Sequence, residues 1–325
     1  MVELLIGDET GTKVYQPIVE DGIEWTTERK NTPGKLVFKI VKDEIIDFTE
    51  GSPVRLTNDN NNIFFGFVFK KQRAKEGIIT VTAYDQLRYL KNKDTKVYEN
   101  ATSSQFVKMI ADDYSLNIGE VEETGYVIES RVEENTSLFE MIANSLDITL
   151  LNTGNMYVLY DDFGHITLKS LTSMYVGVPG AYLMIDEETG KNFDYTSSID
   201  EDTYNKIKLT YDNEDTGYRE VYIAQDGENM NKWGILQYFD TLQKGENGQA
   251  KADALLSLYN KKTRKLKITD AFGDDRVRAG SMVVVNLNLG DIKVCNWMLV
   301  EKCTHTYKEG EHWMDLTLRG GEFIA

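Results

Sequence analysis

Apolar and polar residues alternate along two separate stretches of this chain, and both stretches follow the same plan. The first, Gly51 to Asp85, reads GSPVRL, a polar loop, FFGFVFKK, a short link and GIITVTAYD. The second, Gly280 to Gly320, reads GSMVVV, NLNLGDIKVC, NWMLVEK, a link and HWMDLTLRG. A period of two is the signal of strands with one buried face. Each stretch therefore predicts a set of half-buried strands that begins after a Gly-Ser turn.

The residues ahead of the two stretches also match. Leu36 lies in an alternating segment, KLVFKI, fifteen residues before Gly51, and Leu266 lies in KLKI, fourteen residues before Gly280. A repeat of this length indicates an internal duplication. We therefore expect two similar small β-barrels in one chain.

Between the two stretches the period changes from two to about 3.6 residues, which predicts helices. Thr102 with Gln105, and Ser137 with Glu140, have the spacing of helix capping boxes. An acidic link, residues 120–134, separates the two predicted helices. After the second helix we expect a three-stranded meander, with strands at 148–151, 156–160 and 165–168.

The fold class that follows is mainly β, α+β overall, with two β-barrels and small α+β modules between and outside them. The expected segments are a first barrel (1–95), a small module of two helices plus a meander (96–175), a connector (176–203), a second barrel (204–224 and 262–325) and a helical insertion within it (225–261).

The net charge of the chain argues against two classes of function, nucleic-acid binding and membrane binding. Among 325 residues, 53 are Asp or Glu and 36 are Lys or Arg, which gives a formal net charge of −17. Such a surface repels nucleic-acid phosphate and anionic membrane, so sequence-specific DNA or RNA binding is not expected. No apolar run approaches the length of a membrane span, and residues 1–6 are followed at once by Gly-Asp-Glu, so we expect neither a membrane segment nor a signal peptide.

Candidate chemistry is sparse. The two cysteines, Cys295 and Cys303, do not make a disulfide framework and are expected to be reduced. His305 and His312 flank a predicted hairpin tip and could face each other, and Cys303-x-His305 is a weak zinc pattern. No G-x-S-x-G elbow or P-loop is present, and acidic doublets such as 161–162 and 133–134 look like ordinary exposed carboxylates. We therefore predict no catalytic, cofactor or metal site.

The segment AYDQLRYLKNKDTKVYENATSSQFVKMIADDYSL, residues 83–116, resembles the baseplate hub proteins of contractile tails, of the XkdQ/YqbQ type. Further blocks in the same order also resemble that family: LFEMI (138–142), the strand pair within 157–168, WGILQYF (233–239), WMLVEK (297–302) and MDLTL (314–318). The resemblance covers nearly the whole chain, and it rests on the order of the blocks more than on any single motif.

The resemblance implies barrels like those of a tail tube and a homotrimer, in which three chains with two barrels each form a pseudo-sixfold ring. Such a ring would join the hexameric tail tube to the trimeric spike of a phage, prophage or phage-tail-like bacteriocin. The implied partners are the tail tube protein, the central spike protein, other baseplate proteins and a LysM-type tail protein. DNA would only pass through the lumen. The implied location is the tail baseplate, with synthesis and assembly in the bacterial host cytoplasm.

Two other functions are open from the residues alone: a module that binds or hydrolyses peptidoglycan glycan, and a β-rich adhesin. For the hub, the functional residues would be interface residues on the strands and loops of both barrels. The predicted interface residues are Phe64, Phe65, Phe67, Tyr84, Asp85, Trp233, Tyr238, Trp297 and Trp313.

Overall fold

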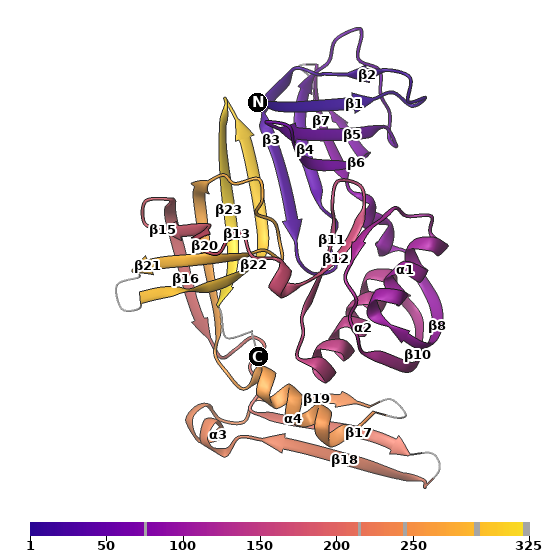
Figure 1. The fold of residues 1–325 in the computed structure, drawn as a ribbon, viewed down its shortest axis with the longest axis vertical. Coiled ribbons are helices and arrows are strands. Elements are labelled where there is room, and N and C mark those ends of the chain that lie inside the picture. Colours follow the sequence, from indigo (N-terminus) through magenta and orange to yellow (C-terminus); the bar gives the residue numbers. More distant parts are fainter. Residues whose placement is uncertain (75–76, 214–215, 243–245, 289–292, 321–325) are drawn as a thin grey trace. The chain divides into compact units, whose positions relative to one another are not determined.

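The chain folds into two compact units, residues 1–194 with 267–318 and residues 195–266 with the chain end (Figure 1). The computed structural model describes residues 1–74, 77–213, 216–242, 246–288 and 293–320. Each unit is described by itself below. Within the described residues, no helix is both long and apolar enough to cross a membrane.

The first of the two predicted strand sets is present in the first unit. Alternation puts Leu36, Phe38 and Ile40 of one strand into the core with almost no exposed surface, and the residues between them are half-buried. The strands of this part are β1 (Val2–Gly7), β2 (Val14–Tyr15), β3 (Val19–Glu28), β4 (Lys35–Val41), β5 (Pro53–Asn58), β6 (Asn61–Arg73) and β7 (Ile78–Tyr84). They pair in the order β3-β4-β7-β6-β5-β1-β2. We call β1 and β3–β7 the first repeat.

The second strand set has the same order. Its strands are β15 (Met184–Asp186), β16 (Gly190–Ser198), β20 (Thr263–Phe272), β21 (Met282–Asn288), β22 (Lys293–Lys308) and β23 (Glu311–Gly320). They pair in the order β16-β20-β23-β22-β21-β15, which corresponds strand by strand to β3-β4-β7-β6-β5-β1. We call these six strands the second repeat. The internal duplication expected from the sequence is therefore present in the topology, although β15 runs parallel to β21 whereas β1 runs antiparallel to β5.

The turns that open the two repeats match in their hydrogen bonds. Gly51 and Gly280 have φ angles of +92° and +93°, a conformation that favours glycine. The Gly51 amide donates to the Val68 carbonyl at 2.7 Å, and the Gly280 amide donates to the Val300 carbonyl at 2.7 Å. The hydroxyl of the next residue, a serine in both repeats, accepts a backbone N–H three positions upstream, at 3.1 and 3.0 Å.

One strand pair joins the repeats. The second half of β22, Lys302–Tyr307, pairs antiparallel with Ile23–Glu28 of β3, while its first half pairs with β21. The mainly β fold class is confirmed, whereas closure of the two expected β-barrels is not detected among the described strand pairs. The described pairs place both repeats in one 13-stranded sheet, because β22 is long enough to serve both repeats. Figure 1 shows β3 and β22 side by side.

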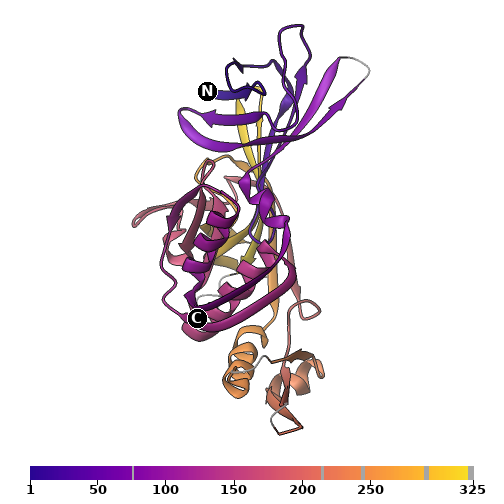
Figure 2. The same ribbon diagram turned by 90° about the vertical axis from the view of Figure 1, so that its right-hand side faces the viewer.

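The α+β module lies between the repeats in sequence and has its own core. Its elements are η1 (a 3-10 helix, Gln86–Lys91), β8 (Lys93–Thr102), α1 (Ser103–Asp113), β9 (Ile118–Val121), β10 (Val127–Ser137), α2 (Leu138–Thr153), β11 (Tyr157–Asp161), β12 (Ile166–Ser170) and η2 (Leu171–Ser173). Both predicted capping boxes form, on α1 and α2. The helices pack against each other, and β8 pairs antiparallel with β10 (Figure 2).

Part of the predicted meander is wrong. Residues 148–151 continue helix α2, which ends only at the left-handed Gly154. Thr149 in this last turn is buried, and its hydroxyl lies 2.8 Å from that of Ser103 at the start of α1. Packing against α1 therefore favours a helix over residues 148–151. The third strand beside β11 and β12 is instead β9, from the segment expected to be an acidic link.

The second unit corrects the predicted second barrel. Strands β17 (Lys206–Asn213) and β18 (Tyr218–Gln225) form a three-stranded sheet with β19 (Gln237–Thr241), and α4 (Gly248–Tyr259) packs on β17 and β18. Helix α3 (Gly227–Trp233) completes this unit. Residues 204–224 therefore pair with their own insertion rather than with 262–325, because Ile207 and Leu209 bury their side chains in this small sheet. The expected connector, 176–203, supplies β15, β16 and the hairpin β13 (Gly177–Val178) with β14 (Ala181–Tyr182).

The two turn glycines give a matched test of how the module contacts the second repeat. A Cβ on Gly280 would overlap the side chain of Val158, whereas a Cβ on Gly51 would meet nothing within 4 Å. Both positions carry the same positive φ, which costs a residue with a Cβ roughly 1–2 kcal/mol. Overlap in a packed core adds about 1–3 kcal/mol. We expect Gly280→Ala to lower the urea-unfolding free energy by about 2 kcal/mol more than Gly51→Ala, and equal losses would contradict the packing of Val158 on this turn.

Candidate functional site

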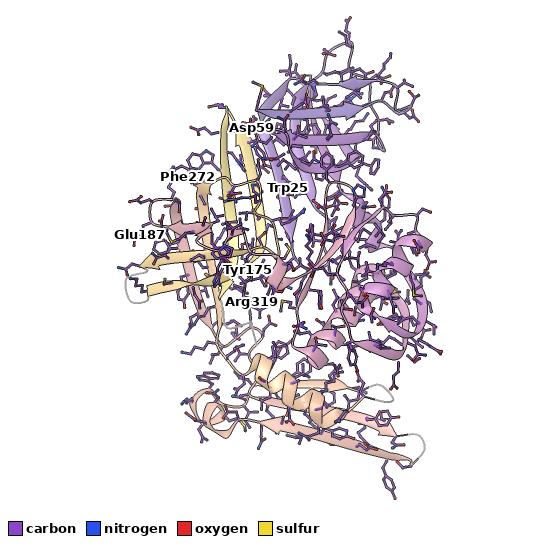
Figure 3. All side chains as sticks on the ribbon, in the orientation of Figure 1. Trp25, Asp59, Tyr175, Glu187, Phe272 and Arg319 are labelled. Carbon is purple, nitrogen blue, oxygen red and sulfur yellow. The ribbon has the colours of Figure 1, made fainter. Side chains whose placement is uncertain are left out.

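The β3–β22 junction is the place where the two repeats share buried polar side chains. Trp25 on β3 stands opposite His305 on β22, and their rings stack at a centroid distance of 4.9 Å. Both side chains are buried, with exposed fractions of 3% and 0%. Figure 3 shows Trp25 at this junction. We call this group of residues the seam.

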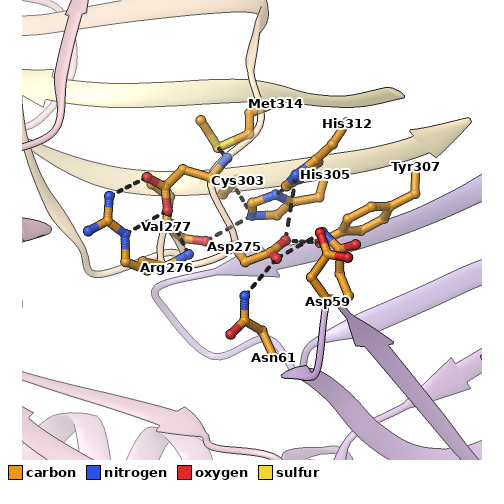
Figure 4. Close-up of polar contacts among 12 residues, drawn as sticks. Asp59, Asn61, Asp275, Arg276, Val277, Cys303, His305, Tyr307, His312 and Met314 are labelled. Atoms are coloured by element: carbon orange, nitrogen blue, oxygen red, sulfur yellow. Dashed lines mark hydrogen bonds and ion pairs between the residues drawn. The ribbon is translucent and has the colours of Figure 1, made fainter. Parts of the chain in front are cut away.

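A chain of hydrogen bonds continues from His305 (Figure 4). His305 Nε2 lies 2.8 Å from the carbonyl oxygen of Val277, and His305 Nδ1 lies 2.8 Å from His312 Nε2. Because a carbonyl oxygen only accepts, His305 Nε2 carries the hydrogen, so its Nδ1 accepts from His312. The two histidines therefore do face each other, as the hairpin spacing suggested. Cys303 Sγ lies 3.1 Å from His305 Nε2.

A residue of the first repeat, Asn58, joins the same network by a hydrogen bond to Asp275. The Tyr307 hydroxyl donates to Asp275 at 2.9 Å, and the Asn58 amide donates to the other carboxylate oxygen at 2.9 Å. His312 Nδ1 lies 3.5 Å from Asp275. Asn58 belongs to β5, whereas Tyr307 and His312 lie on β22 and β23, and Asp275 lies on the loop between β20 and β21. The network therefore fixes one repeat against the other.

The ionisation of this network fits a structural role. Burial lowers the pKa of His305 to about 4, and the neighbouring His312 acts in the same direction. Burial also lowers the pKa of His312 and raises the pKa of the Cys303 thiol. A neutral thiol is a poor nucleophile and a poor metal ligand. Within the described residues, no group of three or more His, Cys, Asp or Glu side chains has the geometry to hold a metal ion.

A second polar junction involves two carboxyl groups. Asp85 is buried, and its carboxylate accepts backbone N–H groups from Gly34 at 2.8 Å and Leu87 at 3.1 Å. Asp161 is buried as well and accepts from the Gly164 amide at 2.7 Å. Burial raises the pKa of Asp85 well above its usual value, and burial raises the pKa of Asp161 to about 6.

Arg278 connects this junction to the seam. Its guanidinium donates to the Asp161 carbonyl at 2.7 Å and lies over the rings of Tyr160 at 4.2 Å and Trp25 at 5.6 Å. The expectation that Asp161 is an exposed carboxylate is therefore wrong. It ends β11 with its side chain turned toward the inside, and Glu133 of the other acidic doublet is buried too, where it pairs with Arg131.

The predicted interface residues of the first repeat largely contact their own chain. Phe64 and Asp85 are buried. Phe65 lies 5.9 Å from the ring of Phe163 in the module, Phe67 lies edge-on to Phe65, and Tyr84 lies edge-on to Phe69. The structure thus brings these residues together around β6 and β7. Whether they also contact another chain stays a prediction.

The remaining predicted interface residues are spread over separate clusters. Trp297 lies edge-on to Tyr175 and Tyr182, at 4.6 and 4.7 Å, and Trp313 stacks on Phe272 at 5.4 Å. In the second unit, Tyr238 lies edge-on to Tyr204 at 5.4 Å, and Trp233 ends α3, half-buried. Contacts of these residues with other chains likewise stay a prediction.

Sequence reasoning missed the centre of the seam, Trp25. It lies in a segment, 23–27, that was expected only to be a short strand. The signal that could have found it is the repeat itself: β3 precedes β4 as β16 precedes β20, so the strand at this place belongs to the duplicated plan.

Comparison with known proteins agrees with this fold. The family model described as YQBQ-like matches residues 23–319. Among curated relatives from Bacillus subtilis (strain 168), the uncharacterised protein YqbQ is 29% identical over 331 residues, and the phage-like element PBSX protein XkdQ is 27% identical over 328 residues. Each alignment covers 97% of this chain and 96% of the relative.

Solved structures share the fold at lower identity. The prophage MuSo2 43 kDa tail protein from Shewanella oneidensis superposes with a TM-score of 0.70 at 13% identity, covering 100% of this chain and 99% of that one. The E. coli c3393 protein, a type VI secretion component described as similar to the T4 tail proteins gp27 and gp5, gives a TM-score of 0.57 at 12% identity, covering 99% and 78%. Since the family model spans residues 23–319, this chain belongs to the YQBQ-like family.

Proposed function

We propose that this chain is the baseplate hub of a contractile tail, a homotrimer whose six repeats form a pseudo-sixfold ring between the hexameric tail tube and the trimeric spike. The observation that carries the proposal is the duplication: two repeats with the same strand order and the same opening turn occur in one chain. Three such chains present six similar positions around one axis. A duplicated unit in a trimer thereby matches sixfold and threefold neighbours.

Two further observations support the role. Relatives and structural neighbours carry names from phage-like elements and phage tails. These names share one description, that of a structural protein of the phage-tail type. The buried groups at the seam are neutral or paired inside the chain, which suits a rigid frame better than catalysis. The partners in this role are the tube, the spike, other baseplate proteins and a LysM-type tail protein. DNA passes through the lumen without being bound.

Light scattering combined with size-exclusion chromatography tests the proposal. A hub gives a species with the mass of three chains. Sedimentation with purified peptidoglycan tests the other candidate class in parallel: a hub alone stays in the supernatant. A monomer that sediments with peptidoglycan would overturn the hub and favour a wall-binding module.

A further inference from the structure

Two strands, β6 and β16, each have one edge without a strand partner within the described residues. They correspond to the two strands, β22 and β3, that pair at the seam. On β22, the stretch Lys302–Tyr307 pairs with β3. Val68 on β6 corresponds to Val300 on β22, because each accepts the amide of the glycine that opens its repeat. Lys302 lies two residues after Val300, so the corresponding stretch of β6 starts at Lys70. Residues 70–73 of β6 pair with β7 on one side, and no described strand lies on the other.

The counterpart of β3 in the second repeat is β16. Strand β3 lies between β4 and β22, whereas β16 has β20 on one side and ends the sheet on the other within the described chain. All nine residues of β16 are exposed or half-buried. An edge strand of this length presents free N–H and C=O groups to another chain.

We propose that β16 of one copy of this chain pairs with residues 70–73 of β6 in a second copy, and so repeats between chains the junction that β3 and β22 make within one chain. This inference rests on the proposed hub and names the surfaces that close its ring. Each chain offers one edge of each kind, so the contact is head-to-tail and closes when three chains have joined.

Side chains at the two edges fit this contact. At the seam, Trp25 packs on His305, and Glu28 pairs with Lys302 at 2.7 Å. At the corresponding positions of β6 stand Arg73 in place of His305 and Lys70 in place of Lys302, and both are exposed. A cationic guanidinium attracts an aromatic face, and an ammonium attracts a carboxylate.

β16 carries groups that can meet these cations. Phe193 is 48% exposed, and Asp194 beside it is exposed as well. With Phe193 opposite Arg73, antiparallel pairing places Asp194 opposite Gln72, diagonal to Lys70 on the same face and within reach of a long side chain. A hollow of about 540 Å³ lies beside β6, between Arg73, Lys71 and the loop residue Phe48. Phe48 lies three residues before Gly51, and Val277 lies three residues before Gly280. Val277 contacts His305, on which Trp25 stacks. By this alignment, the hollow beside Phe48 corresponds to the place that Trp25 occupies at the seam. Phe193 on β16 of the first copy fills this hollow beside β6 of the second copy.

Disulfide trapping tests the pairing directly. In a Cys295→Ser background, which removes the exposed thiol and leaves the buried Cys303, Gln72→Cys is combined with a cysteine at each position from 191 to 196 in turn. Strand pairing predicts covalent three-chain products, reversible by reductant, that peak at one position and fall at its neighbours. The matched control combines Gln72→Cys with Val14→Cys on the other outer strand, β2, which is also exposed.

A side-chain pair gives a second readout. We expect Phe193→Ala to weaken self-association by roughly tenfold or more. Phe272 on the neighbouring strand β20 is somewhat more exposed, at 57%, and we expect Phe272→Ala to weaken self-association by less than about twofold. A three-chain mass without trapping above the β2 control would overturn the pairing and leave the hub intact. The absence of both a three-chain mass and trapping would overturn both proposals.

Discussion

Trp25→Ala is expected to lower the free energy of unfolding of the first unit by about 3–5 kcal/mol, the range for removing a buried large aromatic side chain. Trp25 is 3% exposed, stacks on His305 and lies under the Arg278 guanidinium. Its loss leaves a cavity where the two repeats share their core. A cost of this size is a large part of the 5–15 kcal/mol that stabilises a typical domain.

The measurement is urea unfolding followed by far-ultraviolet circular dichroism, with Trp313→Ala as the control. Trp313 is also a β-strand tryptophan, but it is half-buried and stacks on Phe272, which is exposed. We expect its removal to cost about 1 kcal/mol. If both variants lose the same free energy, the seam does not hold the repeats together.

Acid is expected to weaken the seam through His305. In the folded chain the pKa of His305 is about 4, against about 6.5 in an unfolded chain. Below pH 6.5 the unfolded chain binds a proton that the folded chain does not bind, so the stabilisation is complete above pH 6.5 and is lost as the pH falls toward 4. For a fully buried group, a difference of this size corresponds to about 3 kcal/mol. The lowered pKa of His312 acts with the same sign.

Other charged groups around the histidine pair have to be separated from this effect. Asp274, Asp275 and Arg278 lie on the loop packed against the pair, and Tyr307 and Cys303 lie on its own strand. Asp161 acts in the opposite direction, because its raised pKa of about 6 makes the folded state gain stability as the pH falls from 6 toward 4. Asp85, whose pKa burial also raises, acts in the same direction as Asp161. A wild-type pH profile alone therefore mixes these effects with that of His305.

The variants His305→Gln and Asp161→Asn separate them. The difference in unfolding free energy between wild type and His305→Gln should shrink by about 3 kcal/mol between about pH 7.5 and pH 4, because only the wild type takes up the proton on unfolding. Asp161→Asn should make the chain more sensitive to acid in the same window. If the difference for His305→Gln did not change with pH, the pKa of His305 would be the same in the folded and unfolded chains. That result would contradict the burial of His305 at the seam.

Local patterns predicted the elements well where one face of a strand is buried. Residues 35–41 form β4 as the alternation indicates, and both capping boxes form because a side-chain oxygen three positions from its partner satisfies a free amide wherever a helix begins. The repeat spacing around Gly51 and Gly280 predicted the duplicated strand order, since matching strands and the same opening turn recur in both repeats.

What the sequence could not predict depends on partners far along the chain. Nothing local says that β22 pairs with β3 some 280 positions away, or that residues 206–213 pair with 237–241 instead of joining the second repeat. The burial of Asp161 likewise depends on Arg278 and on the module that packs around it. Hence the strands were predicted, whereas the seam and the polar junction beside it were not.

Negative-stain electron microscopy of the assembled protein tests the central claim, that two repeats per chain occupy six equivalent positions around one axis. The expected averages are closed rings with six similar lobes and a threefold modulation, because each chain adds one α+β module and one second unit to its two lobes. Rings with three lobes, rings with a number of lobes other than six, or dispersed single chains would contradict it.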